Sequence, residues 1–338
     1  MHNRDIVAIG ASAGGVEALR RLVGGLPAEL PAAVFVVLHI GNAHPTHLAE
    51  ILAAAGPLPA QPAVDGEPIL PGRIYVAVSD RHLILGAGRV LLRRGARENR
   101  FRPAVDPLFR SAAMHYGGRV IGVVLTGYLN DGASGLHAIK RCGGLAVVQD
   151  PADAVAPDMP KSALRHAAVD HCVPIGEMGG LLRRLTAEAA GASPPAPGEI
   201  LREVQFATQE QATMVHQRGS GPPSIFTCPD CNGPLWETRE GELLRYRCHV
   251  GHAVTAGALL AAESEELERA LSSALRSHKE RTELLRRMAE SAEESGKSSM
   301  AATWRDRAAE AEVDADAIRR VLLRTSAPDS FADAGVID

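Results

Sequence analysis

Short apolar runs of β-strand type alternate with helical segments through residues 4–186 of the chain. The strand candidates are residues 5–10, 33–38, 73–78, 119–126 and 145–149, with a further apolar run at 168–175. The helix candidates are residues 15–25, 46–55, 107–116, 133–141, 160–166 and 177–189. Strands that alternate with helices predict an α/β fold with a doubly wound, mainly parallel sheet. Residues 82–92 differ, because glycines in the middle of an apolar run indicate a hairpin.

Three of the apolar runs lead into residues that can perform chemistry together. Ser12 lies in the small-residue turn Gly10–Gly15 after the first run, His39 directly follows the second, and Asp131 follows the run at 119–126. The carboxyl ends of strands form the ligand crevice of an open α/β sheet, so a nucleophile, a base and an orienting carboxylate can meet there. A turn serine, a buried histidine and a helix-capping aspartate are each common. Their joint placement after strands favours a Ser-His-Asp catalytic centre.

A phosphate-binding turn is the competing interpretation of the glycine-rich segment. Its sequence is Gly-Ala-Ser-Ala-Gly-Gly rather than the GxGxxG of dinucleotide-binding folds, and no P-loop lysine follows it. The catalytic interpretation is therefore preferred.

The same residues resemble a known family. Gly10–Gly15, the strand ending in His39 and residues 125–133 are similar to the three catalytic segments of the CheB-type chemotaxis methylesterases. The segments at 77–83, 105–113, 149–150 and 159–160 agree with this resemblance and follow the same order. The resemblance covers about residues 4–186.

The resemblance implies an enzyme that hydrolyses glutamyl methyl esters on receptor signalling helices, and it leaves open a second activity, the deamidation of glutamines. Ser12 is then the nucleophile, His39 the general base and Asp131 the residue that orients the imidazole. Backbone N–H groups near Ala13 and Gly14 are the expected oxyanion donors. No cofactor is implied for catalysis. The implied partners are methyl-accepting receptor helices, with a methyltransferase or a response regulator as further candidates.

The chain departs from the family pattern at several points. Ala13 stands where many members have threonine, and Tyr128-Leu129 stands where many have Met-Gly, so Tyr128 is a candidate substrate residue. The first strand begins almost at Met1, so we expect the catalytic domain without the N-terminal receiver domain that covers the active site of two-domain members. The alternative function is a non-catalytic adaptor that binds receptor or methyltransferase helices.

A basic segment lies between the third and fourth strands of this pattern. It contains Arg93, Arg94, Arg97, Arg100 and Arg102, opposed only by Glu98. A solvated loop is the ordinary explanation of such a run. Because receptor methylation helices are rich in glutamate, Arg100 and Arg102 are also candidates for docking an acidic helix.

A metal-ligand pattern follows the catalytic region, 1–190, and a linker, 191–224. Cys228 and Cys231 form a CxxC pair, and Cys248 and His252 supply a second pair, which together match the ligands of tetrahedral zinc. His249 competes with His252 as the fourth ligand. Residues 225–255 are thus expected to form a zinc-ribbon-like module with a structural zinc ion, the alternative being unrelated cysteines in a small core.

The C-terminal region, 256–324, has the apolar spacing of long helices, followed by a tail at 325–338. The expected apolar positions are Leu260, Ser264, Leu267, Leu271, Ala274, His278, Arg281, Leu285 and Met288, and then Ala301, Trp304, Ala308, Ala311, Ala315, Ile318 and Leu322. A helical hairpin or a coiled coil is predicted. Packing within the chain is the simpler interpretation, and self-association or pairing with a receptor coiled coil is the alternative.

Composition excludes several classes of protein. The net charge of −4 argues against nucleic acid as a partner, since neither half of the chain is basic enough to imply one. No apolar run approaches the roughly 20 residues of a membrane span, and we expect no signal peptide. Five cysteines, three of them clustered late, suggest a reducing compartment, and we expect a cytoplasmic protein.

Overall fold

The computed structural model describes residues 2–39, 47–208, 221–240 and 243–325. Its largest element is a seven-stranded parallel sheet with the strand order β3-β4-β2-β1-β7-β8-β9. The strands are β1 (Ile6–Ala11), β2 (Ala33–Leu38), β3 (Ala60–Pro62), β4 (Ile74–Val76), β7 (Val120–Val124), β8 (Leu145–Gln149) and β9 (His171–Val173). This parallel sheet confirms the predicted α/β fold class.

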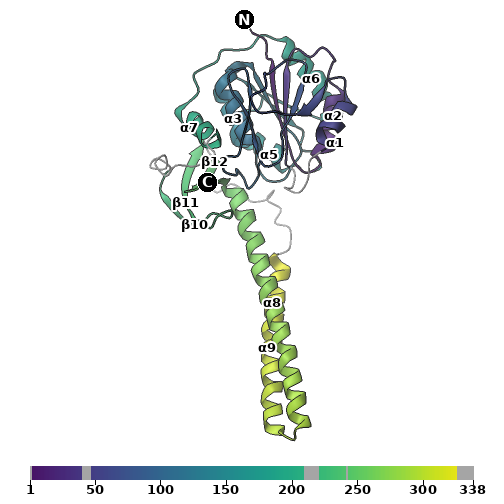
Figure 1. Cartoon of the computed structure of the whole chain (residues 1–338), viewed down its shortest axis with the longest axis vertical. Helices are drawn as coiled ribbons and strands as arrows, with labels where there is room; N and C mark the ends of the chain where they lie inside the picture. The colour runs from purple at the N-terminus through teal and green to yellow at the C-terminus, as the bar shows by residue number, and fades with distance from the viewer. Residues whose placement is uncertain (1, 40–46, 209–220, 241–242, 326–338) are drawn as a thin grey trace. The chain divides into compact units, whose positions relative to one another are not determined.

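Helices cover both faces of the sheet (Figure 1). One face packs on α1 (Gly15–Gly24), α2 (Leu48–Ala55) and α6 (Ile175–Ala187), and the other on α3 (Val105–Tyr116), α4 (Ala133–Arg141) and α5 (Asp158–His166). A short 3-10 helix, η1 (Gly117–Arg119), leads into β7. Because alternate residues of a strand point to opposite faces, Val7 and Ile9 enter one core while Ile6 and Ala8 enter the other. Burial on both faces explains the nearly continuous apolar runs.

The differences from the predicted elements lie mostly at the edge of the sheet. The strand expected over residues 73–78 is only Ile74–Val76. The edge strand β3 was not predicted, because Ala60–Pro62 has no apolar run and ends in a proline, which an edge strand tolerates. The predicted hairpin is present as β5 (His82–Leu85) paired antiparallel with β6 (Val90–Arg93).

A small antiparallel sheet follows, which we call the ribbon. It consists of β10 (Pro223–Thr227), β11 (Pro234–Glu240), β12 (Leu243–Cys248) and β13 (Ala253–Thr255). Its own apolar cluster includes Leu235, Tyr246 and Val254. The segment expected as a linker contains a helix, α7 (Gly198–Thr208), whose Ile200 and Val204 join the core beside α3. Their i, i+4 spacing is the helical signal in that otherwise polar stretch.

Two long helices complete the described chain: α8 (Ala256–Glu294) and α9 (Ser298–Thr325). The chain reverses at Gly296, whose φ of 69° is the left-handed conformation that often ends helices. Leu285 packs against Ala308 and Ala311, which confirms a helical C-terminal region and gives it the form of a hairpin (Figure 1). The chain divides into two compact units between Leu259 and Leu260. The helical hairpin from Leu260 onward is the second unit.

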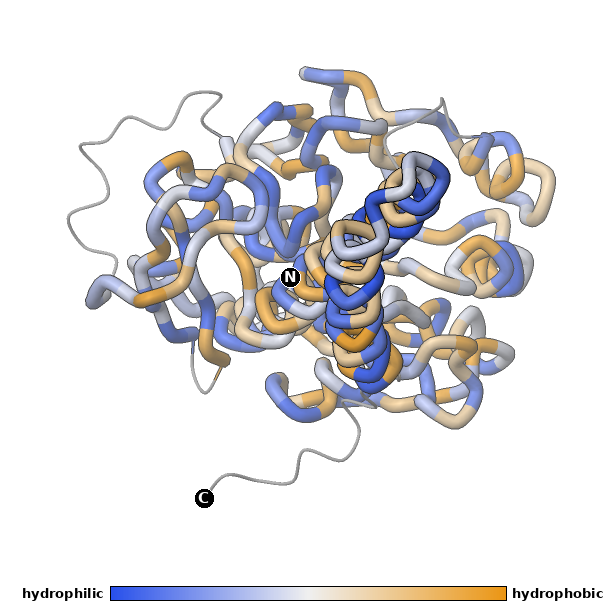
Figure 2. The backbone as a smooth tube through the Cα atoms, turned by 90° about the horizontal axis from the view of Figure 1, so that it is seen from below, coloured by the Kyte–Doolittle hydropathy of each residue, from blue (hydrophilic) through white to orange (hydrophobic). Residues whose placement is uncertain are grey.

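The apolar stripe of α8 differs from the predicted one. Leu285 is buried as predicted, but Leu260, Leu267 and Met288 are exposed. Other buried positions of α8 include 282, 289 and 292. Alternation of hydrophobic and hydrophilic residues along these helices is visible in Figure 2. Buried alanines shift the stripe because their small side chains let the helices approach closely. None of the described helices is long and apolar enough to cross a membrane.

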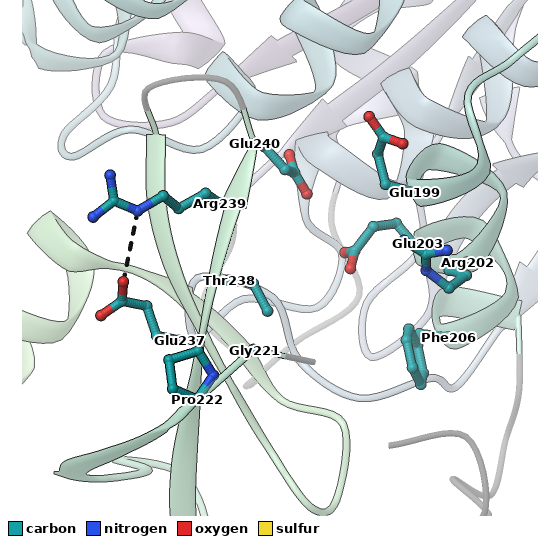
Figure 3. A pocket seen from close by; sticks show the side chains of 10 residues that line it. All are labelled: Glu199, Arg202, Glu203, Phe206, Gly221, Pro222, Glu237, Thr238, Arg239 and Glu240. Carbon is teal, nitrogen blue, oxygen red and sulfur yellow. Dashed lines mark ion pairs between the residues drawn. The ribbon is translucent and has the colours of Figure 1, made fainter. Parts of the chain in front are cut away.

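Three arginines and three glutamates form a buried cluster between α3, α7 and the ribbon. We call it the ionic cluster, and its members are Glu98, Arg110, Glu203, Glu240, Arg245 and Arg247. Figure 3 shows Glu203 of α7 and Glu240 of β11 extending from opposite walls of one pocket. Their charges balance one another.

Arg245 is the centre of the ionic cluster. Its guanidinium lies 3.0 Å from the carboxylate of Glu98 and 3.2 Å from that of Glu203, and it also pairs with Glu240. The side chains of Arg245 and Glu98 are each only 2 % exposed. Removing one charge from such a cluster leaves its partners buried without compensation.

Arg245→Ala is expected to lower the free energy of unfolding by about 3–5 kcal/mol, because Glu98 would keep a buried charge with fewer partners. The matched control is Arg239→Ala on β11. The Arg239 side chain is 69 % exposed, and its one ion pair among the described residues is a long one, 3.6 Å from Glu237. That control should cost less than about 1 kcal/mol. Urea unfolding of the full chain measures both, and equal costs would contradict this account of the ionic cluster.

Candidate active site

Strand register brings the three predicted catalytic positions to one edge of the sheet. Ala11 of β1 pairs with Leu38 of β2, so Ser12 and His39 are the next residues on neighbouring strands. On the other side of β1, the Ser12 N–H donates to the carbonyl of Thr126 at 2.9 Å. The loop after β7 then carries Asp131 back toward His39. Three adjacent strands therefore supply the serine, the histidine and the aspartate.

A buried hydrogen bond joins His39 and Asp131. The imidazole Nε2 lies 2.7 Å from Asp131 Oδ2, and both side chains are 2 % exposed. The ring also stacks on Phe101, with centroids 3.8 Å apart and planes inclined by 2°. The second nitrogen, Nδ1, is buried and has no hydrogen-bond partner in the part of the chain that the structure describes. The imidazole is thus oriented by a carboxylate at its edge and an aromatic ring on its face.

The Asp131 carboxylate accepts several hydrogen bonds in addition to that of His39. The backbone N–H groups of Val105 and Asp106, in the first turn of α3, donate at 2.7 and 3.2 Å. The Asn99 amide donates at 3.1 Å, and the Gly132 N–H at 3.0 Å. The first N–H groups of a helix have no partner within it, so they stabilise a negative charge.

These contacts decide the charge of the site. Burial by itself raises the pKa of Asp131, but the hydrogen bond and charge of His39, with the N–H of Val105 and the amide of Asn99, together hold that pKa well below its usual range. Burial and the nearby charge of Asp131 raise the pKa of Asp106 well above its usual range. Of these two carboxyl groups, Asp131 therefore keeps the negative charge beside His39.

The turn that carries Ser12 has the features of an oxyanion site. The Thr126 hydroxyl donates to the Ala13 carbonyl at 2.9 Å, which fixes the peptide after Ser12. The N–H groups of Ala13 and Gly14 donate to no described residue and lie where α1 begins. Gly127 permits the close approach of the next loop, because a Cβ there would lie 2.7 Å from that of Ser12. Two N–H groups are therefore available beside the serine.

The predicted substrate residues are placed differently. Tyr128 is 63 % exposed on the loop that leads to Asp131. Arg100 lies in a tight turn with a φ of 71°. Arg102 pairs with Asp80 and donates to the Gly95 carbonyl at 2.7 Å, with its side chain 14 % exposed. This geometry does not support the docking role predicted for Arg102, because its guanidinium is committed within the fold.

Three residues that the sequence did not single out support the site: Asn99, Phe101 and Thr126. Thr126 belongs to a segment that resembles the family, and its position directly after an apolar run is a signal that could have identified it. Asn99 and Phe101 lie in the basic segment, where no local pattern of the sequence distinguishes them from the surrounding residues. Their roles depend on contacts distant in sequence.

The cysteine pattern forms a compact cluster in the ribbon. The donor atoms of Cys228, Cys231, Cys248 and His252 all lie within 4.8 Å of one another. Sγ of Cys231 and Sγ of Cys248 are 3.6 Å apart, and His252 Nδ1 lies 3.7 and 3.6 Å from Cys228 and Cys248. A tetrahedral zinc ion has S–S edges of about 3.8 Å and S–N edges of about 3.6 Å, so the donors fit that ion.

The fourth donor of this cluster is His252 rather than His249. The ring of His249 instead covers Gly233, where a Cβ would lie 2.2 Å from the ring carbon Cε1. The structure thus separates the two candidates that the sequence left open.

Comparison with known proteins agrees with the observed fold. A family model described as CheB methylesterase matches residues 7–182, more than half of the chain. A protein-glutamate methylesterase/protein-glutamine glutaminase of Anaeromyxobacter dehalogenans is 43 % identical over 182 residues, which cover 54 % of this chain and 53 % of that protein. A protein of the same description from Myxococcus xanthus is 44 % identical over 156 residues, which cover 46 % of this chain and 44 % of that protein.

Among solved structures, the CheB methylesterase catalytic domain of Thermotoga maritima is similar, with a TM-score of 0.52 and 35 % identity. The match covers 54 % of this chain and 98 % of that domain. The chain spans about half the length of the curated relatives it matches. By the extent of the family match and the agreement of its parallel sheet, this chain belongs to the CheB methylesterase family.

Proposed function

We propose that the chain is a protein-glutamate methylesterase that hydrolyses glutamyl methyl esters on chemoreceptor-type signalling helices. The observation that carries this proposal is the buried His39–Asp131 hydrogen bond, which lies in register beside Ser12. The relatives named above are described as methylesterases and glutaminases, which supports this reaction class.

In this proposal Ser12 Oγ attacks the ester carbonyl and its proton passes to Nδ1 of His39, the nitrogen that faces away from Asp131. The negative charge of Asp131 stabilises the imidazolium that forms. The N–H groups of Ala13 and Gly14 stabilise the tetrahedral oxyanion. The geometry of the turn supports this role, since neither N–H donates to a described residue.

The second half of the reaction uses the same groups. The imidazolium protonates the methoxy oxygen, methanol departs, and Ser12 carries an acyl group. A water molecule gives a proton to His39 and attacks the acyl carbon. The imidazolium then returns that proton to Ser12 Oγ as the acyl–oxygen bond breaks, which leaves a glutamate side chain on the receptor and restores the serine. With a glutamine side chain the leaving group is ammonia, so one site accounts for both activities in the relatives' description.

Exposed Tyr128 and the Arg100 turn are the proposed contacts for the substrate helix. Binding of a methyltransferase or a response regulator, and self-association through α8 and α9, stay predictions from the sequence.

Ser12→Ala is expected to lower kcat for methanol release from methylated receptor membranes by on the order of 10⁶-fold, because the nucleophile is lost. Asp131→Asn should lower kcat by about 10⁴-fold, since the imidazole loses its orienting charge. The matched control is Ser162→Ala, a partly buried serine on α5, which should release methanol at the wild-type rate. A wild-type chain that binds the receptor but releases no methanol would instead establish the adaptor function.

We further infer that Cys228, Cys231, Cys248 and His252 hold a zinc ion. Four protein ligands close the coordination sphere, so the metal would stabilise the ribbon and take no part in hydrolysis. The donor distances support this assignment.

The purified chain should contain one zinc ion per molecule by elemental analysis. His252→Ala and Cys231→Ser should lose that zinc, whereas His249→Ala should keep it, because His252 belongs to the cluster of four donor atoms. The control is Cys172→Ser, which changes an exposed thiol on β9. Retention of zinc by His252→Ala together with its loss in His249→Ala would reverse the assignment.

A further inference from the structure

The ribbon lies directly against the segment that carries Asn99. The Asn99 N–H donates to the Ala253 carbonyl at 2.8 Å, and the Ala253 N–H donates to the Arg97 carbonyl at 3.1 Å. Residues 97–99 thus pair with β13 as an added strand would. Backbone pairing of this kind fixes the position of the segment without depending on side-chain identity.

Thr255, the last residue of β13, contacts both segments that flank the Asp131 carboxylate. Its N–H donates to Asn99 Oδ1 at 3.1 Å, and its hydroxyl donates to Asn130 Oδ1 at 2.6 Å. The same hydroxyl accepts the Ala258 N–H at 3.2 Å, which caps the first turn of α8. One residue therefore ties the start of a helix to the two asparagines.

The contact to Thr255 determines which way the Asn99 amide points. Because Oδ1 accepts the Thr255 N–H, the Nδ2 group must face the two carboxyl groups, and it lies 3.1 Å from Asp131 Oδ1 and 3.2 Å from Asp106 Oδ2. An amide turned the other way would set its oxygen against two carboxyl groups. Asn99 also has a φ of 50°, which asparagine tolerates better than most residues.

The loop on the other side of Asp131 is held by apolar contacts. Leu129, with a φ of 65°, packs against the apolar cluster of the ribbon, which includes Cys228 and Cys248. The two segments beside Asp131, Asn99 on one side and residues 129–130 on the other, therefore both contact the ribbon.

We propose that Asn99 is a positioning residue for the Asp131 carboxylate, and that Thr255 fixes it, which makes the ribbon part of the esterase's catalytic architecture. This inference rests on the proposed function, since it assigns Asp131 the task of orienting His39. Asn99 touches neither the ester nor the reacting atoms. Its effect reaches catalysis through the direction and charge of the carboxylate.

Asn99→Gly tests the amide directly. Glycine accepts the positive φ and keeps the N–H that bonds to Ala253, so only the side-chain contacts are lost. We expect kcat for methanol release to fall about 10- to 100-fold with KM unchanged, because a hydrogen bond to a charged group is removed. A variant that keeps the wild-type kcat, or that changes KM alone, would overturn the proposal.

Asn99→Asp gives a readout that a purely structural role would not produce. It keeps the acceptor for Thr255 but places a third carboxyl group against those of Asp106 and Asp131. The other charged or titratable groups around this position are Glu98, Arg102, Arg110, Arg245, His39 and His82. Burial and the two neighbouring carboxyl groups favour the protonated form of the introduced group, which can donate to Asp131 as the amide does.

We therefore expect the ratio of Asn99→Asp to wild-type kcat to rise as the pH is lowered from 8 toward 6. A ratio that stays constant with pH would contradict a role as hydrogen-bond donor. Thermal unfolding of each variant confirms that the comparison concerns folded protein.

The contribution of the ribbon is tested at Thr255. Thr255→Val keeps the N–H that bonds to Asn99 but removes the hydroxyl that bonds to Asn130 and caps α8, so the backbone at residue 255 is held less firmly. We expect kcat to fall several-fold, whereas Thr255→Ser keeps the hydroxyl and should retain the wild-type kcat. The control is Thr238→Val, which removes a hydroxyl that donates to the backbone carbonyl of Arg245 within the ribbon at 3.3 Å.

Equal loss in Thr255→Val and Thr255→Ser, or equal loss in the Thr238→Val control, would overturn the role of Thr255. If the wild-type chain releases no methanol, the proposed function itself fails. If the wild type is active and the Asn99 variants match it, this inference alone fails.

Discussion

The ionic cluster around Arg245 joins parts of the chain that are far apart in sequence. Glu98 precedes α3, Glu203 lies on α7, and Arg245 belongs to the ribbon, yet their charges are buried together. Burying charges is costly, so a balanced cluster adds little net stability. It discriminates strongly against other arrangements, because any docking that separates the partners leaves a charge without compensation. The position of the ribbon against the catalytic fold follows from this constraint.

Glu98 links that cluster to the catalytic centre. It immediately precedes Asn99, whose amide contacts Asp131, and one turn of α3 separates Asp106 from Arg110. The start of α3 thus presents N–H groups to Asp131 while its next turn presents an arginine to Glu98. Burial and the charge of Asp131 raise the pKa of Asp106, against the lowering effect of Arg110 and Arg245. Burial would also raise the pKa of Asp131, but His39, the N–H of Val105 and the amide of Asn99 lower it.

The family match ends before the ribbon begins. Residues 7–182 match the family model and contain the strands that carry Ser12, His39 and the loop to Asp131. The ribbon lies beyond that match, yet it supplies Thr255 and the backbone partner of Asn99. A segment outside the family match thereby contacts Asn99, which donates to the Asp131 carboxylate. A domain boundary placed between the family match and the ribbon would separate Thr255 from Asn99, although the two residues are hydrogen-bonded.

The sequence by itself determined the parallel α/β fold, the positions of Ser12, His39 and Asp131 after strands, and the cysteine pairs of the ribbon. Each is a local signal: an apolar run, its end, or a fixed spacing of ligands. Only the tertiary structure decided that His252 rather than His249 completes the cysteine cluster, that Arg102 is committed to Asp80, and that Asn99 and Phe101 support His39 and Asp131. The physical reason is that these outcomes depend on contacts between segments distant in sequence, where direction and burial, rather than residue type, determine what a side chain can do.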